Sequence, residues 1–178
     1  MKPPRVGVFA GAGIGTDRRF AAAARALGME IASRDLALVF GGEATGLMGA
    51  VADGCVEAGG EAIGVIPRFL ADTGTPHPGA DIRIVETLAE RKLLMADLSA
   101  GFVALPGGLG TLDELTEMVT WTQLGVHEKA VSLLDVAGCW DDFAALLETM
   151  VANGFVRPEV RDLLRFEGSA ATALDALG

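Results

Sequence analysis

Short runs of consecutive apolar residues, most of them closed by glycine or proline, constrain this chain more than any other feature. They lie at 5–10, 36–40, 62–66, 82–85, 102–105 and 131–134. Unbroken apolar runs are typical of strands that helices cover on both faces. Segments with helical periodicity alternate with them, at 17–27, 46–58, 88–98, 111–124, 141–153 and 169–177, and Pro158 predicts a short helix near 159–164. This alternation predicts an α/β fold, a doubly wound parallel sheet with helices on both faces.

The length of 178 residues fits one domain, 1–178, because no linker or internal repeat divides the chain. The segment 72–80 is rich in Gly, Pro and Thr and predicts a mobile loop. Met1 to Arg5 lack the apolar stretch of a secretory signal, and no run approaches the ~18 apolar residues of a membrane span. We therefore expect a cytoplasmic protein without a membrane segment.

Charge and cysteine usage exclude several classes of function. With 24 acidic and 14 basic residues, the net charge of −10 argues against a nucleic-acid-binding protein, which needs a basic face. A small anionic ligand remains compatible with this charge. Cys55 and Cys139 belong to no CxxC or Cys/His cluster, so we expect no metal site and two buried thiols. His77 and His127 are expected at the surface, with His77 in a loop that closes over the ligand.

Three glycine-rich turns follow three of the predicted strands, at Gly11–Gly15, Gly41–Gly46 and Gly107–Gly110. In such folds ligands bind beyond the carboxyl ends of the strands, where glycine allows close backbone approach. A helix that starts there offers free N–H groups to a phosphate. Gly11 and Gly42 are therefore candidate ligand contacts. The spacing matches neither the dinucleotide fingerprint GxGxxG nor the triphosphate loop GxxxxGK[ST].

The segment Pro106–Glu114, PGGLGTLDE, is the most specific of these turns. Thr111 is expected to be the N-cap, and a capping box between Thr111 and Glu114 explains both residues without any ligand. A cap alone does not require the preceding Pro-Gly-Gly, whereas a phosphate cradle does. The cradle is therefore predicted from four residues, Gly107, Gly108, Gly110 and Thr111.

Glu90-Arg91-Lys92 stand at the start of the helix that precedes this turn. A solvated charged turn would explain them in isolation. The chain order nevertheless brings Arg91 towards the same sheet edge, where a guanidinium can bind phosphate or polarise a leaving group.

Together these segments resemble the Lonely Guy (LOG) family, and the similarity continues to the segment 154–159 near the end of the chain. The family comprises cytokinin riboside 5′-monophosphate phosphoribohydrolases, many of them mislabelled as lysine decarboxylases. The resemblance implies a Rossmann-like fold and a homodimer with active sites at the subunit contact. It also implies catalytic roles for Arg91 and Glu114 and phosphate contacts from the glycines of the cradle. Ala, Met and Leu in segments 46–58 and 111–124 are candidates for the dimer face.

The implied reaction is hydrolysis of the N-glycosidic bond of a nucleoside 5′-monophosphate, giving free base and ribose 5-phosphate without a cofactor or metal. Glu114 would stabilise an oxocarbenium-like transition state and orient water, and Arg91 would hold the substrate. Lys92 and Leu88 are counted among the substrate contacts. Asp113 and Glu117 are expected only to complement the helix dipole.

The sequence departs from the family at three places. Leu88-Ala89 replace Met-His, Glu43 replaces a third glycine, and Ala12-Gly13 replace serines. The change at Leu88-Ala89 affects recognition of the base, and the loss of the serines removes hydroxyl contacts from the protein to the nucleotide. Arg91 and Glu114 stay intact.

Alternative functions remain open at this point. One is a non-catalytic nucleotide-binding or molybdenum-cofactor carrier protein, and another is an AMP-binding regulatory domain. An NAD-linked enzyme is disfavoured by the glycine spacing. A lysine decarboxylase needs a lysine that forms a Schiff base with pyridoxal phosphate, and the chain offers only Lys2, Lys92 and Lys129.

Overall fold

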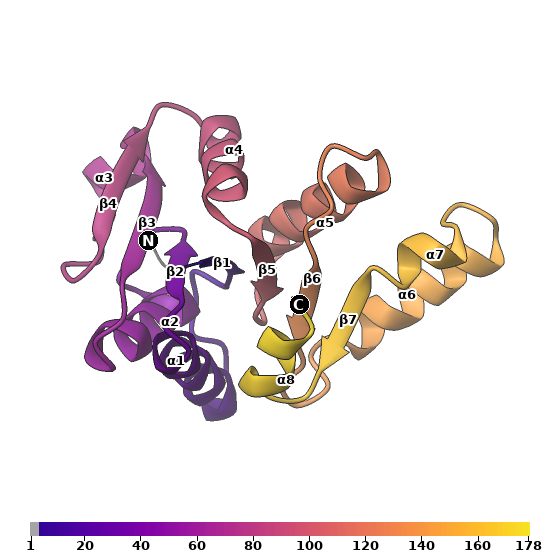
Figure 1. Ribbon diagram of the computed structural model, residues 1–178, viewed down its shortest axis with the longest axis horizontal. Helices are drawn as coiled ribbons and strands as arrows, with labels where there is room; N and C mark the ends of the chain where they lie inside the picture. The colour runs from indigo at the N-terminus through magenta and orange to yellow at the C-terminus, as the bar shows by residue number, and fades with distance from the viewer. Residues whose placement is uncertain (1–3) are drawn as a thin grey trace.

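The computed structural model describes residues 4–178, where seven strands form one all-parallel sheet. The sheet order is β4-β3-β2-β1-β5-β6-β7 (Figure 1). This confirms the predicted doubly wound parallel sheet. The expectation that the N-terminal segment lacks a secretory signal falls in part on Met1 to Pro3, which lie outside the described residues. The strands are β1 (Arg5–Phe9), β2 (Ala37–Phe40), β3 (Ala62–Pro67), β4 (Asp81–Val85), β5 (Gly101–Ala104), β6 (Val131–Leu134) and β7 (Leu164–Glu167).

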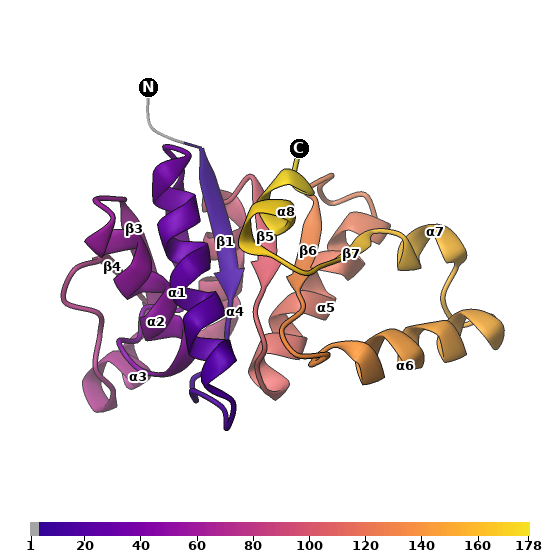
Figure 2. The same ribbon diagram turned by 90° about the horizontal axis from the view of Figure 1, so that it is seen from below.

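Helices cover both faces of the sheet. They are α1 (Arg18–Ser33), α2 (Gly46–Glu57), α3 (Arg68–Thr73), α4 (Leu88–Leu98), α5 (Leu109–Gln123), α6 (Asp141–Ala152), α7 (Pro158–Arg161) and α8 (Ala170–Asp175). In Figure 1, α1, α2 and α8 lie below the strands, and α4 and α5 lie above them. Figure 2 shows α1 and α8 in front of the sheet, with α6 and α7 reaching outward past β7.

The continuous apolar strands supply two separate cores, because successive side chains point to opposite faces. Val8 of β1 packs with Leu27 and Val51 on the α1/α2 side. Its neighbour Phe9 packs with Phe102 and Leu115 on the α4/α5 side. Both faces of the inner strands are therefore buried, as their apolar runs predict, whereas the edge strand β4 is largely exposed.

Strand order reverses at β1. The chain first builds β2, β3 and β4 on one side of β1, and α4 then carries it back to β5 on the other side. Loops that leave β1 and its two neighbours diverge to opposite faces, which opens a crevice at the carboxyl ends of these strands. The fold thus places the three glycine-rich turns around one site.

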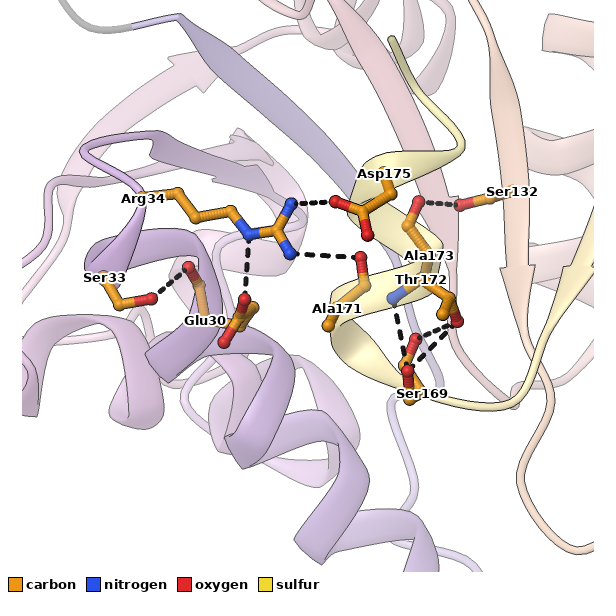
Figure 3. Close-up of polar contacts among 9 residues, drawn as sticks. All are labelled: Glu30, Ser33, Arg34, Ser132, Ser169, Ala171, Thr172, Ala173 and Asp175. Atoms are coloured by element: carbon orange, nitrogen blue, oxygen red, sulfur yellow. Dashed lines mark hydrogen bonds and ion pairs between the residues drawn. The ribbon is translucent and has the colours of Figure 1, made fainter.

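The C-terminal helix is fixed to α1 and to the sheet by side-chain hydrogen bonds (Figure 3). Arg34 at the end of α1 bonds Glu30 at 2.8 Å, Asp175 at 2.6 Å and the carbonyl of Ala171 at 3.2 Å. Ser132 of β6 donates to the carbonyl of Ala173 at 2.8 Å. The last helix therefore belongs to the same packed body as the first.

Two elements were not predicted, α3 and β7. The helix expected near 159–164 is shorter, Pro158–Arg161, and the chain then enters β7. This strand lies at the sheet edge and buries Leu164 while exposing Arg165, so it lacks the unbroken apolar run of the inner strands. Helix α3 is a single short segment at the start of the β3–β4 connection.

The prediction of a surface His77 is wrong, whereas the mobility expected of the segment 72–80 stays a prediction. His77 is only 5% exposed, and its Nε2 lies 3.0 Å from Asp53 Oδ1 on α2. Its backbone N–H donates to the carbonyl of Gly42, and Thr75 accepts from the N–H of Ala44. The loop is pinned to the β2 turn and to α2 by contacts between residues distant in the sequence.

His127 is partly rather than fully exposed, and burial lowers its pKa. Only one of the two cysteines is buried as expected. Cys55 lies in the core, and burial raises its pKa to about 11, whereas Cys139 is exposed in the β6–α6 turn. Among residues 4–178, no helix is both long enough and apolar enough to cross a bilayer.

Candidate functional site

The three glycine-rich turns meet at the carboxyl edge of β2, β1 and β5, as predicted. Gly11 after β1 donates its N–H to the carbonyl of Pro106 after β5, at 3.1 Å. The carbonyl of Gly11 accepts from the N–H of Leu47 at the start of α2, at 2.9 Å. The three turns are therefore joined through the main chain of one residue.

The turn after β5 leads into α5 three residues earlier than expected. Helix α5 begins at Leu109 with Gly108 as N-cap, so Thr111 lies in its first turn and the predicted capping box between Thr111 and Glu114 is wrong. Within residues 4–178, the N–H groups of Leu109, Gly110 and Thr111 make no hydrogen bond. Free N–H groups and the positive end of the helix dipole make this turn suited to an anion.

A close contact between Gly107 and the side chain of Thr111 accompanies the early start of the helix. Thr111 is 3% exposed, and a Cβ on Gly107 would overlap its side chain. Thr111 thus packs under the turn instead of capping the helix. A Cβ on Gly108 or Gly110 would meet nothing within 4 Å, because both residues face open space.

A cavity of about 380 Å³ lies in front of this helix start, within the range of small-molecule sites. Its walls come from the loops after β1, β2 and β5, from α3 and from α4. The lining residues are Ala10, Ala12, Gly41, Glu43, Met48, Leu70, Arg91, Gly108, Gly110, Thr111 and Glu114.

Arg91 and Glu114 face each other across this cavity. Arg91 Nη2 lies 3.4 Å from Glu114 Oε1, and the two side chains are 12% and 10% exposed. Arg91 Nε also donates to the carbonyl of Val65 at the end of β3, at 3.1 Å. The start of α4 is fixed by Thr87, whose hydroxyl accepts from the N–H of Glu90. The local structure therefore holds the guanidinium in one place.

Burial dominates the electrostatics of Glu114. Removal from water raises the pKa of its carboxyl, and the charge of Arg91 opposes this shift only in part. A buried carboxyl with a raised pKa in a cavity is typical of acid–base sites.

Lys92 lies behind the cavity and does not line it. Its Nζ is 3.0 Å from both Asp113 Oδ2 and Glu117 Oε2, so one lysine of α4 joins two carboxylates of α5. Lys92 is 16% exposed, and its pKa is raised despite a desolvation penalty because both carboxylates accept from it. Asp113 and Glu117, expected to complement the helix dipole, instead link α5 to α4. The three consecutive residues thus have different surroundings: Glu90 contacts the cap of α4, Arg91 lines the cavity, and Lys92 binds α5.

The other predicted contacts surround the cavity without lining it. Leu88 is 50% exposed on α4. Gly42 has φ +86 and packs on Ile66, and Gly11 packs between the turns after β1 and β5. Both glycines therefore determine the backbone path of these loops. Met48 and Leu70 also line the cavity, although no sequence pattern pointed to them. Glu43 lines it too and stood out in the sequence only as a departure from a family pattern. No cluster of three or more potential metal ligands occurs in residues 4–178.

Comparison with known proteins identifies the family. Residues 48–177 match the family model described as "Possible lysine decarboxylase". The chain is 42% identical over 174 residues to the "Probable cytokinin riboside 5'-monophosphate phosphoribohydrolase LOGL1" of Oryza sativa subsp. japonica, covering 97% of this chain and 77% of that protein. It is 40% identical to LOG3 of Arabidopsis thaliana, a cytokinin riboside 5′-monophosphate phosphoribohydrolase, over 90% of this chain and 75% of that one.

This chain belongs to the LOG family. The LOG relatives span almost its whole length, which confirms the resemblance drawn from the glycine-rich segments. Among solved structures, the molybdenum cofactor carrier protein of Chlamydomonas reinhardtii superposes with a TM-score of 0.75 at 24% identity, covering 98% of this chain and 95% of that one. At that identity the likeness shows that the LOG chain and the carrier share a fold.

Proposed function

We propose that this protein hydrolyses the N-glycosidic bond of nucleoside 5′-monophosphates, including cytokinin riboside 5′-monophosphates, to free base and ribose 5-phosphate. The observation that carries the proposal is the buried Arg91–Glu114 pair at 3.4 Å, in one cavity with the free N–H groups of α5. One domain, 1–178, would contain all of this machinery.

The start of α5 would bind the 5′-phosphate. Gly108 and Gly110 leave room for the phosphate oxygens, and the N–H groups of the first turn point to the same space. Because Glu114 lies one turn further along α5, a phosphate held at the helix start places the ribose beside its carboxylate.

Glu114 would act in its ionised form. As the bond from C1′ to the base nitrogen breaks, its electron pair leaves with the base and positive charge develops on the ribose ring. The carboxylate stabilises this charge and accepts a proton from the water that attacks C1′. The departing base then takes up a proton, which balances the hydrolysis.

Arg91 would hold the substrate and balance the charge of Glu114. Its guanidinium is anchored to the carbonyl of Val65, so it keeps its place when a substrate competes for the carboxylate. A fixed positive charge beside the base also favours departure of the bonding electrons.

The lysines of the described chain do not support decarboxylation through a Schiff base. Lys92 is held by Asp113 and Glu117, and Lys129 Nζ donates to the carbonyl of Ala96. Neither lysine lines the cavity. Lys2 lies outside the described residues.

We also propose a homodimer whose active sites lie at the subunit contact. Leu109 is 85% exposed beside the cavity, and an apolar groove of about 230 Å³ between α5 and α6 is lined by residues that include Val119, Phe143 and Met150. By contrast, Val51 and other apolar residues of α2 are used in the core. Light scattering should give twice the monomer mass, and Leu109→Asp should lower both the mass and the activity. A monomeric wild-type protein would contradict this proposal.

We also propose a cytoplasmic location for the protein. Cell fractionation tests it directly.

The decisive experiment follows base and ribose 5-phosphate release from AMP and from isopentenyladenosine 5′-monophosphate by chromatography. Wild type should release both products in equal amounts, and Glu114→Gln should release at least ~100-fold less while still binding AMP. Glu128→Gln, a charge change on the exposed α5–β6 loop, is the matched control and should keep full activity. Binding without release by wild type would instead favour the non-catalytic nucleotide-binding alternative.

A further inference from the structure

Three charged side chains line the cavity, and only two of them are paired with each other. Arg91 and Glu114 form the ion pair, whereas Glu43 stands alone. Within residues 4–178 the Glu43 carboxylate accepts no hydrogen bond and forms no ion pair. A half-buried carboxylate without a protein partner in a ligand cavity is a candidate for contact with the ligand.

The backbone around Glu43 is fixed on both sides. Glu43 forms a bridge with Pro76, and the N–H of Ala44 donates to the carbonyl of Thr75 at 2.8 Å. The N–H of His77 donates to Gly42 at 2.9 Å, and His77 is itself held by Asp53. The carboxylate is therefore presented from a rigid turn, as a side chain that recognises a ligand requires.

The place of Glu43 in the sheet tells which part of a nucleotide it meets. The phosphate-binding helix start follows β5, and Glu43 follows β2, with β1 between them. Because neighbouring strands are about 4.8 Å apart, these two turns are separated by roughly 10 Å. The Arg91 guanidinium contacts both sides, because its Nη2 lies 3.4 Å from Glu114 Oε1 on α5 and occupies the space that a Cβ on Gly41 of the β2 turn would need. A nucleotide with its phosphate at α5 and its C1′ at Glu114 directs its base towards Glu43 and Leu70.

We propose that Glu43 determines base specificity by accepting a hydrogen bond from an amino group on the base. This rests on the proposed hydrolase function. An ionised carboxylate can only accept, so it favours the N–H donor of a 6-aminopurine and repels the acceptor oxygen of a 6-oxopurine. An N6-substituted adenine keeps one N–H and remains a partner for Glu43.

The test compares kcat/KM for AMP and for inosine 5′-monophosphate. Wild type should prefer AMP by at least about tenfold, because the oxo base leaves the half-buried Glu43 carboxylate without a donor. Glu43→Gln can donate as well as accept, so it should reduce the AMP preference at least tenfold. Asp72→Asn removes a nearby exposed carboxylate of α3 that does not line the cavity, and it should keep the wild-type ratio.

Two results would overturn the role of Glu43. One is equal turnover of both nucleotides by wild type, and the other is an unchanged ratio in Glu43→Gln. If wild type hydrolyses neither nucleotide, the proposed function fails, and calorimetric binding of AMP and inosine 5′-monophosphate to wild type and Glu43→Gln still decides on Glu43. In that binding experiment, tighter binding of AMP than of inosine 5′-monophosphate by wild type, lost in Glu43→Gln, supports the role of Glu43. Equal affinities of wild type for the two nucleotides contradict that role.

Discussion

Arg91 Nη2 lies 3.4 Å from Glu114 Oε1 although the two residues come from different helices, and both side chains are almost fully buried. Charged groups are rarely buried without a use, because removing them from water is costly. Burial raises the pKa of Glu114 even with Arg91 beside it. Burial therefore disfavours the ionised form of Glu114 that the proposed reaction needs, and experiments can measure the effect on activity and on stability.

The first prediction concerns the pH dependence of activity. Glu114 must be ionised to act, and its pKa is raised, so kcat/KM should fall with acid at a pH above the ~4.3 of an ordinary glutamate. The measurement is a pH profile for AMP hydrolysis from pH 4 to 9. An acidic limb at or below pH 4.3 would contradict the proposed role.

The second prediction concerns stability. A carboxyl with a raised pKa in the folded state stabilises the protein below its unfolded pKa and loses that contribution as pH rises through the folded pKa. Glu114→Gln should therefore melt at a higher temperature than wild type at pH 8, and the difference should shrink towards pH 4. Thermal unfolding at several pH values checks this, and a lower melting temperature of the variant at pH 8 would show that Arg91 outweighs desolvation.

The third prediction separates packing from binding in the phosphate turn. Gly107→Ala forces a Cβ onto Thr111 and should cost about 2 kcal/mol, or roughly 4–8 °C in melting temperature. The Cβ added by Gly110→Ala meets no protein atom, so the melting temperature should stay unchanged. The KM for the nucleotide should rise. Melting curves and kinetics on both variants decide this, and equal melting losses would contradict it.

The fourth prediction treats Lys92 as a positioning residue. Lys92→Met leaves Asp113 and Glu117 without their cation, so their charges should raise the pKa of Glu114 further and move the acidic limb of kcat to higher pH. Without Lys92 the helices α4 and α5 lose their link and shift relative to each other. This shift should also lower kcat by roughly 10- to 100-fold with little change in KM. Lys92→Arg should restore much of the loss. A rise in KM alone would instead indicate direct substrate contact.

The inner part of the fold could be predicted from the sequence because its signals are local. Strands such as β2 and β5 are unbroken apolar runs, and the glycine-rich turns at their ends mark the site. The edge strand β7 was missed because LRFE has only one buried face, and an alternating segment of four residues resembles a helix end.

The errors at the site arise from long-range contacts. Nothing near His77 in the sequence indicates that Asp53 will bury it, and nothing in PGGLGT shows that Thr111 will pack under Gly107 rather than cap the helix. Arg91 and Glu114 were found because a family pattern pairs them. Their 3.4 Å separation depends on how α4 crosses back over the sheet.

Gly11 binds both neighbouring turns through its backbone N–H and carbonyl, so main-chain hydrogen bonds join the three turns. Side chains on the surrounding loops are then free to change while the phosphate seat stays intact. In the proposed roles, recognition of the base at position 43 and recognition of the phosphate at α5 are separate in this sense. We therefore expect that a single replacement on the β2 turn can exchange one nucleobase for another without loss of phosphate binding.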